Sequence, residues 1–155
     1  RIVEVTMAIK PWTEYFLDLA KTCASRSNCL RANVGAVIVG DDKTIKATGY
    51  NGTPSKVESC AERGECYRIC NNIPSGTRYE TCRSIHAEQN AIIQAGQDRC
   101  KDATIYIWGH NFICILCKRF IVQSGITHCV LKKNDDSPIV RVSVEDIRRE
   151  LEEQR

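Results

Sequence analysis

His86-Ala87-Glu88 stands at the start of one predicted helix, and Cys114-Ile115-Leu116-Cys117 stands at the start of another. Imidazole nitrogen and cysteine thiolate are the ligands that zinc prefers, and three of them leave one tetrahedral position open, as in catalytic sites. Two cysteines three residues apart at a helix start can reach the same ion. The two segments therefore predict a zinc site on His86, Cys114 and Cys117, with Glu88 beside the metal but not bound to it.

Strands and helices alternate along the rest of the chain. Strands are predicted at 34–39, 44–50, 103–108, 128–131 and 139–142. Helices are predicted at 11–24, 86–95 and 114–124, and after Ser143, which is expected to be an N-cap. The first strand is an apolar run without alternation, typical of a strand covered on both faces, and it is expected to form a hairpin with the second. This pattern predicts an α/β domain whose sheet carries helices on both faces.

The first predicted helix carries an apolar stripe. Its members recur at helical spacing, which indicates packing against the core rather than a ligand site. They are Trp12, Tyr15, Phe16 and Leu19.

The bulk composition is that of an ordinary globular chain. Its 155 residues are 43% hydrophobic and 26% charged with a net charge of +3, so we expect a single domain over 1–155. No run of Lys or Arg forms a basic stripe, which argues against nucleic acid as a partner. No apolar stretch approaches the roughly 18 residues that a membrane span needs, and no secretory signal is recognisable. We therefore expect a cytoplasmic protein without a membrane partner. Met7 is expected to be the native start, with residues 1–6 belonging to something upstream.

The ten cysteines are more typical of metal ligands or small buried hydrophobes than of disulfides, because nothing in the sequence indicates export. Cys23, Cys100 and Cys129 fall in predicted helices or sheet regions and are expected to be core residues. A polar segment at 55–83 holds four others and shows no clear periodicity. Because an unstructured loop of that length is unusual, a metal clip would explain its order. The alternative is a flexible lid with incidental cysteines.

His-x-Glu followed by Cys-x-x-Cys is the signature of zinc-dependent nucleobase deaminases. Zinc lowers the pKa of its bound water from about 15.7 to about 7. Glu88 would take a proton from that water, pass it to the ring nitrogen and then protonate the departing amine. The alternatives are a structural zinc site, buried thiols, or a Cys-x-x-Cys redox pair, which leaves His86 and Glu88 unexplained.

Several further motifs resemble deoxycytidylate deaminases. They are the segment 29–39, Gly49-Tyr50-Asn51-Gly52, Ile73-Pro74-Ser75-Gly76 and the segment 82–92. The resemblance covers about residues 12–131. It implies the cytidine-deaminase fold, a three-layer α/β/α structure with a mixed five-stranded sheet, and the conversion of dCMP to dUMP for thymidylate synthesis. It also implies a homo-oligomer, often a hexamer, with dCTP and dTTP as effectors acting with Mg²⁺.

By position, the resemblance implies a catalytic zinc on His86, Cys114 and Cys117, with Glu88 as the proton shuttle. It implies substrate contacts at Asn51 and Ala87. The Asn51 amide can both donate and accept a hydrogen bond; the alternative for Asn51 is a turn residue at positive φ.

The resemblance also implies a second, structural zinc held by the insert 55–83 and a neighbouring cysteine. Four thiolates would make a closed tetrahedral site. The matching positions are Cys29, Cys60, Cys66 and Cys82, and Cys70 could replace one of them. The alternative is free buried thiols.

One group of polar residues is a candidate for a 5′-phosphate, which it would bind through charge-assisted hydrogen bonds. The group comprises Arg26, Ser27, Asn28 and Arg31. It could equally serve an allosteric nucleotide or be a solvated loop.

Ile113 stands where the family pattern has proline. The chain thereby loses a residue that fixes φ at the helix start, and the pocket wall could change shape. Two other functions therefore stay open. One is a deaminase of tRNA or single-stranded polynucleotide, which would favour a basic groove with aromatic platforms. The other is a zinc-stabilised regulator that binds nucleotides without turnover.

Overall fold

A mixed five-stranded sheet lies at the centre of the computed structural model, which describes residues 8–154. The predicted start at Met7 and residues 1–6 lie outside the described residues. The strands are β1 (Gly35–Val39), β2 (Ile45–Tyr50), β3 (Thr104–Trp108), β4 (His128–Lys132) and β5 (Val140–Ser143). Their order is β2-β1-β3-β4-β5. β3 and β4 are parallel, and the other neighbours are antiparallel. The predicted mixed sheet and the hairpin of the first two strands are confirmed.

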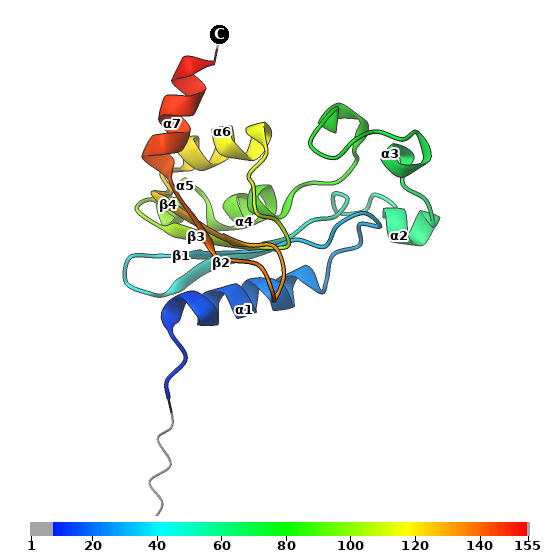
Figure 1. Cartoon of the computed structure of the whole chain (residues 1–155). Coiled ribbons are helices and arrows are strands. Elements are labelled where there is room, and N and C mark those ends of the chain that lie inside the picture. The colour runs from blue at the N-terminus through cyan, green and yellow to red at the C-terminus, as the bar shows by residue number, and fades with distance from the viewer. Residues whose placement is uncertain (1–7, 155) are drawn as a thin grey trace, which may run out of the picture.

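Helices cover both faces of this sheet, as Figure 1 shows. One face packs against α1 (Trp12–Ala24), and the other carries α4 (Ala87–Ala95), α5 (Gln97–Cys100) and α6 (Ile115–Ser124). The C-terminal α7 (Val144–Glu153) packs beside α6. Ser143 caps α7, since its hydroxyl accepts a hydrogen bond from the Glu145 amide at 3.2 Å. The three-layer prediction is confirmed, and only α5 was not predicted among these helices. None of the helices within residues 8–154 has the length and apolar character needed to cross a bilayer.

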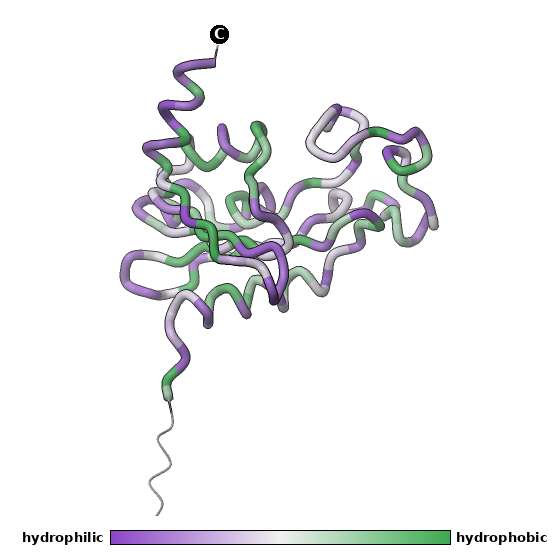
Figure 2. The backbone as a smooth tube through the Cα atoms, in the orientation of Figure 1, coloured by the Kyte–Doolittle hydropathy of each residue, from purple (hydrophilic) through white to green (hydrophobic). Residues whose placement is uncertain are grey.

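Two hydrophobic clusters lie on opposite faces of the sheet. Alternate residues of β1 supply both, because successive side chains of a strand point to opposite faces. Val37 packs in the cluster on the α1 side, and Ile38 packs in the larger cluster under α4 and α6. Cys100 and Cys129 are buried in the larger cluster as predicted, while Cys23 lies half-buried beside the smaller one. Figure 2 shows the central strands largely in the hydrophobic colour.

The apolar stripe predicted for α1 is only partly buried. Phe16 is 1% exposed, but Trp12 is 54% and Tyr15 is 41% exposed. The buried face is formed instead by Phe16, Leu17, Ala20 and Ala24. Trp12 stacks on Phe16 from the first turn, with ring centroids 5.4 Å apart. The prediction that the whole stripe packs into the core is therefore wrong.

Gly49 sets the distance between β2 and α4. A Cβ atom at this position would lie 2.4 Å from the carbonyl oxygen of Ala87 and 2.6 Å from the amide nitrogen of Ala91. Both are backbone atoms of α4, which cannot move aside without moving the helix. The missing side chain thus lets the start of α4 lie directly on the sheet.

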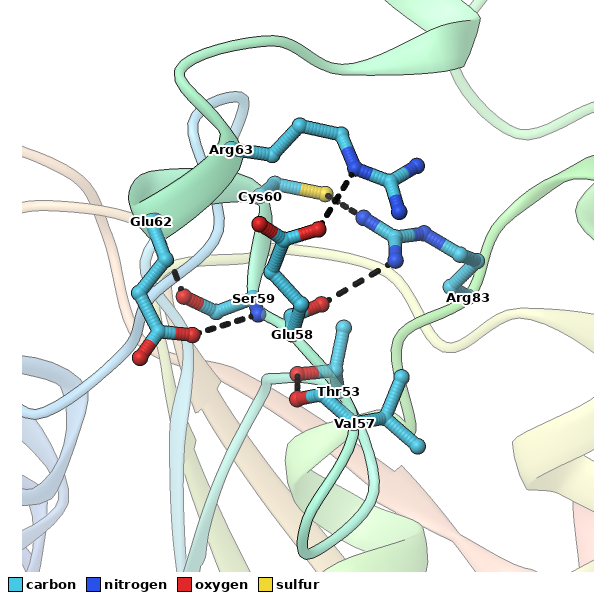
Figure 3. A network of polar contacts seen from close by, with 8 residues as sticks. All are labelled: Thr53, Val57, Glu58, Ser59, Cys60, Glu62, Arg63 and Arg83. Carbon is cyan, nitrogen blue, oxygen red and sulfur yellow. Dashed lines mark hydrogen bonds and ion pairs between the residues drawn. The ribbon is translucent and has the colours of Figure 1, made fainter.

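The insert 55–83 is held by hydrogen bonds between its two ends. It contains α2 (Cys60–Arg63), α3 (Tyr67–Cys70) and the 3-10 turn η1 (Tyr79–Thr81), and α2 and α3 lie beside the sheet rather than over it (Figure 1). At its start, Ser59 and Glu62 form a capping box with hydrogen bonds of 2.7 and 3.0 Å. At its end, Arg83 donates to the Glu58 carbonyl oxygen at 3.0 Å and to the Cys60 sulfur at 3.7 Å, as Figure 3 shows. The bonds of Arg83 join the end of the insert to its start.

We expect Gly49→Ala to destabilise the protein by about 1–3 kcal/mol, the usual range for overpacking, because the added methyl group meets the backbone of α4. Urea unfolding of both proteins measures the difference. Gly40→Ala is the matched control, since its methyl group would meet only the side-chain ends of Lys46 and Asp42. Equal losses in the two variants would contradict the close approach of α4.

Candidate functional site

His86, Cys114 and Cys117 meet where α4 and α6 begin. His86 is the N-cap residue of α4, and Cys114 is the N-cap residue of α6. The His86 Nδ1 atom lies 3.3 Å from Cys114 Sγ and 3.3 Å from Cys117 Sγ. Within residues 8–154, this is the one group of three or more His, Cys, Asp or Glu side chains whose potential ligand atoms all lie within 4.8 Å of one another. The structure thus brings together the three residues that the sequence predicted.

The spacing of the three donor atoms fits one tetrahedral zinc ion. Zn–N bonds near 2.0–2.1 Å and Zn–S bonds near 2.3 Å place nitrogen and sulfur about 3.5 Å apart. The observed separations of 3.3 Å differ from this by a few tenths of an ångström. Glu88 is adjacent but lies outside the group. The protein therefore offers three ligands and leaves the fourth position free, which is the pattern of a catalytic site.

Local hydrogen bonds fix both helix starts. The His86 amide donates to Gln89 Oε1 at 2.9 Å, and the Cys117 amide donates to Cys114 Sγ at 3.4 Å. The free N–H groups of a helix start also favour negative charge, which suits a thiolate at the first turn of α6.

The protons of the three ligands are strongly coupled. A hydrogen bond from Cys117, aided by His86, lowers the pKa of the Cys114 thiol to about 4 in spite of its burial. The same bond and burial raise the pKa of Cys117. Burial lowers the pKa of His86, but the hydrogen bond to Cys114 and its negative charge outweigh this and raise it. A divalent cation bound here would displace the protons that these ligands carry.

A pocket opens over this cluster. Glu88, the second residue of α4, is 4% exposed and is the only carboxylate among the described residues that line the pocket. The lining also includes Val34, Asn51, Ala87, Tyr79, His110 and Phe112, together with Cys29, Arg31, Cys66, Arg68, Ser75, Gly76 and Cys82. Most of this lining is apolar or aromatic, with few charged groups, as in sites for small molecules.

Aromatic residues form a wall that the sequence did not predict. The Tyr79 ring meets the His86 ring edge-on, with centroids 5.0 Å apart, and burial raises the pKa of Tyr79. His110 packs on Phe112 at 5.0 Å, and burial lowers the pKa of His110. Tyr79 lies in the insert, where no periodicity pointed to it. His110 and Phe112 could have been found, because residues just before Cys114 must lie near the metal ligands.

Asn51 and Ala87, the predicted substrate contacts, both line the pocket. Asn51 Oδ1 accepts a hydrogen bond from the Val34 amide at 2.9 Å, and its Nδ2 donates to the Ala32 carbonyl oxygen at 2.7 Å. Asn51 is not among the residues at positive φ, so the alternative of a left-handed turn residue is wrong. The side chain holds the 32–34 segment against the pocket and keeps one N–H free.

The four cysteines predicted for a second zinc are not gathered in this structure. Sulfur atoms on one tetrahedral zinc lie about 3.8 Å apart, yet no three of the side chains of Cys29, Cys60, Cys66 and Cys82 come within 4.8 Å of one another. Cys60 lies against Arg83 instead. Cys70, the substitute ligand, is exposed. In this structure the four thiols lie apart and three of them line the pocket, so the second zinc stays a prediction.

The four residues predicted to bind a phosphate also lie in different surroundings. Arg31 lines the pocket, but Arg26 is exposed to solvent. The Ser27 hydroxyl accepts a hydrogen bond from the Cys29 amide at 3.3 Å and so shapes its own loop. Asn28 lines a different surface depression, together with two glutamates. The four residues do not line one pocket in this structure, and their shared anion site stays a prediction.

Ile113 is buried in the core. It is 7% exposed and packs in the larger hydrophobic cluster, and it is not among the residues that line the pocket. The expectation that it reshapes the pocket wall is therefore not met. Its burial fixes the start of α6 by packing, where proline would have fixed it through φ.

Comparison with known proteins gives consistent matches. Residues 10–133 match the family described as the cytidine and deoxycytidylate deaminase zinc-binding region. The deoxycytidylate deaminase of Saccharomyces cerevisiae is 44% identical over 124 residues, which cover 79% of this chain. The chain spans only 38% of the length of that yeast protein. The deoxycytidylate deaminase of Mycobacterium phage D29 is 34% identical over 131 residues, which cover 82% of this chain and 98% of the phage protein.

A solved structure agrees with these matches. The crystal structure of the dCMP deaminase from cyanophage S-TIM5 in complex with dCMP and dUMP has a TM-score of 0.55 and 25% identity. The likeness covers 77% of this chain and 80% of the phage chain.

We expect the purified protein to hold about one zinc ion per chain, because three potential ligands converge at one place among residues 8–154. His86→Ala and Cys114→Ser should each bring the metal content near background. Cys60→Ser, which removes a thiol outside the cluster, is the matched control and should leave the content unchanged. Elemental analysis after gel filtration in metal-free buffer measures all four proteins. Two zinc ions in the wild type that fall to one in Cys60→Ser would contradict the single site.

Proposed function

The chain belongs to the family of cytidine and deoxycytidylate deaminases, and we propose that it hydrolyses dCMP to dUMP and ammonia. The observation that carries the proposal is a buried carboxylate, Glu88, beside a three-ligand cluster with a free fourth position. Activating water and relaying its protons is the task for which deaminases use this arrangement. The relatives named deoxycytidylate deaminase support the choice of substrate.

The residues of the chain divide the reaction between them. Zinc bound by His86, Cys114 and Cys117 would supply a Lewis acid that makes water nucleophilic at neutral pH. Glu88 accepts a proton from that water on a carboxylate oxygen and delivers it to the cytosine ring nitrogen. It then transfers a second proton to the amino group, so that ammonia leaves as the C4 oxygen becomes a carbonyl.

Glu88 is available for this relay because no cationic side chain among the described residues neutralises it. It forms no ion pair within residues 8–154. Its position in the first turn of α4 ties it to His86 two residues earlier, so the carboxylate and the metal ligand move as one unit. A relay needs this fixed geometry, since proton transfer requires hydrogen-bond contact with both water and base.

The rest of the pocket suits a pyrimidine nucleotide. Tyr79, His110 and Phe112 offer flat surfaces for the base, and Ala87 leaves room at the floor. Asn51 retains one amide N–H for the sugar or the base after its two backbone contacts. Asn51 and Ala87 are buried, whereas Phe112 is 44% exposed.

Other features implied by the resemblance remain predictions. They are a homo-oligomer such as a hexamer, dCTP and dTTP as effectors, Mg²⁺ bound with an effector nucleotide, a second zinc, and a cytoplasmic location. Deamination of polynucleotide and nucleotide binding without turnover are the alternatives to the proposed reaction. No group on the described surface favours either, and the next experiment decides between them.

We expect Glu88→Gln to lower kcat for dCMP by about 10²–10⁴-fold, the usual contribution of a positioned acid–base group, while zinc stays bound. Ammonia release from dCMP and from a tRNA anticodon stem-loop measures the activity. Glu14→Gln is the matched control, because it makes the same change in the first turn of α1, at an exposed position. Full activity of Glu88→Gln, or a wild type that releases ammonia only from RNA, would refute the proposal.

A further inference from the structure

His110 is the one histidine whose ring nitrogens are unused within residues 8–154. The His86 ring lies against two cysteine sulfurs, and the His128 ring contacts the Thr127 hydroxyl at 3.1 Å, whereas the His110 ring makes no hydrogen bond within these residues. Its nitrogens are also not among the enclosed side-chain atoms without a partner, so they are accessible. Since His110 lines the pocket, its ring can bind a ligand there.

The backbone at Gly109 fixes the place of His110 at the pocket. A φ of +106° at Gly109 turns the chain directly after β3. A Cβ atom on Gly109 would lie 2.3 Å from the carbonyl oxygen of Asn33, so only glycine allows this close approach. Asn51 holds the same segment, 32–34, against the pocket. His110 therefore follows a tight backbone contact between two parts of the pocket wall.

The imidazole of His110 meets the ring of Phe112 at an angle. The two ring centroids lie 5.0 Å apart, and the ring planes are inclined at 47°. A planar base that lies flat on Phe112 therefore cannot lie flat on His110 as well. The edge of the imidazole, which carries both nitrogens, can instead point at a substituent of the base.

The His110 ring is a neutral hydrogen-bonding group at neutral pH. Burial lowers its pKa, although the negative charge of Glu88 acts against this. A neutral imidazole has one N–H donor and one nitrogen acceptor. The ring can therefore accept a hydrogen bond from an amino group, which a protonated ring could not do.

Deamination benefits from an acceptor for the amino group. Water attacks the ring carbon that carries this group, so the group lies near the metal ligands. Its nitrogen must turn a lone pair toward Glu88 to receive the proton, and a hydrogen bond from one of its own N–H groups would hold it in that orientation. The Asn51 oxygen already accepts from the Val34 amide at 2.9 Å. His110, four residues before Cys114 in the loop that leads to it, offers an unused acceptor.

We propose that His110 accepts a hydrogen bond from the 4-amino group of the pyrimidine, which selects the amino substrate and orients its leaving group. The inference rests on the proposed function, because it assumes that the base lies with C4 at the metal ligands. It assigns a substrate contact to a residue that the sequence did not predict. Glu88 still transfers both protons, so His110 neither gains nor loses a proton in the reaction.

The test uses a ligand that lacks the amino group. It is the 5′-monophosphate of the pyrimidin-2-one deoxyribonucleoside, which carries hydrogen at C4. In the zinc-loaded protein we expect His110→Phe, which keeps a ring against Phe112, to lower kcat/KM for dCMP about tenfold, the usual effect of losing one hydrogen bond. The Kd of the analogue, measured by calorimetry, should change little. His128→Phe makes the same change at an exposed position of β4 and is the matched control, which should keep the wild-type values.

Two amide variants distinguish a hydrogen bond from a structural role. Asparagine carries an acceptor oxygen near the place of Nδ1, and glutamine carries one near the place of Nε2. One of His110→Asn and His110→Gln should therefore recover part of the activity that His110→Phe loses, and it identifies the nitrogen concerned. His110→Ala replaces His110→Phe if the latter does not fold, because it removes atoms without adding any.

Three results would overturn the inference. The first is an equal loss of dCMP turnover and of analogue binding in His110→Phe, which would show that the ring only shapes the pocket. The second is turnover of dCMP by His110→Phe at the wild-type rate. The third is the absence of recovery in both amide variants.

The outcomes separate this inference from the proposed function. A wild type that deaminates dCMP no faster than His110→Phe does refutes the role of His110 and leaves the function standing. A wild type that releases no ammonia from dCMP refutes the function. Calorimetry then still tests His110, because His110→Phe should weaken the binding of dCMP relative to that of the analogue, and an unchanged ratio would count against the proposed contact.

Discussion

The convergence of two helix starts on one point is the constraint on which the structure depends. α4 lies along the sheet, and β3 follows it in the chain. α6 then runs in the same direction as α4, so both helices begin at the same edge. The β3–α6–β4 crossover joins parallel strands and places α6 on the face that α4 already covers. His86 and Cys114 each cap one of these helices. Chain topology therefore brings the His86 Nδ1 atom within 3.3 Å of each of the two sulfurs, although 28 residues separate His86 and Cys114 in sequence.

Close packing fixes the positions of the two helix starts relative to the sheet. Gly49 lets α4 rest on β2 without a side chain between them, and Ile113 anchors the start of α6 in the core. Each device fixes one helix relative to the sheet, and the separation of the ligands depends on both. A metal site formed by two elements tolerates little error, because zinc accepts a narrow range of bond lengths. Glu88 is positioned with the same precision relative to the metal ligands, since it follows His86 in the first turn of α4.

Features encoded locally could be predicted from the sequence, and those that depend on tertiary contacts could not. The five strands and the ligands in His-x-Glu and Cys-x-x-Cys follow from short-range periodicity and spacing, and the structure places them within a residue or two. Trp12 and Tyr15 share the helical spacing of Phe16, but spacing does not tell where the sheet beneath α1 ends. Arg68 and Tyr79 reach the pocket through the turn 73–77 and the hydrogen bonds of the insert, for which no periodic signal exists. The contact between Arg83 and Cys60 likewise joins residues far apart in sequence, and no local pattern predicts it.

Arg68 and Glu88 line one pocket and are both nearly buried, yet they do not pair with each other. Direct pairing would compensate both charges and leave neither for a ligand. The Tyr79 ring beside Arg68 and His86 keeps the guanidinium apart from the metal ligands and Glu88. The pocket thus presents a positive wall and a carboxylate at separate places, an arrangement complementary to a ligand with an anionic end and a basic ring nitrogen. A fold that leaves two buried charges uncompensated loses stability, and such losses are concentrated at functional sites because substrate binding offsets them.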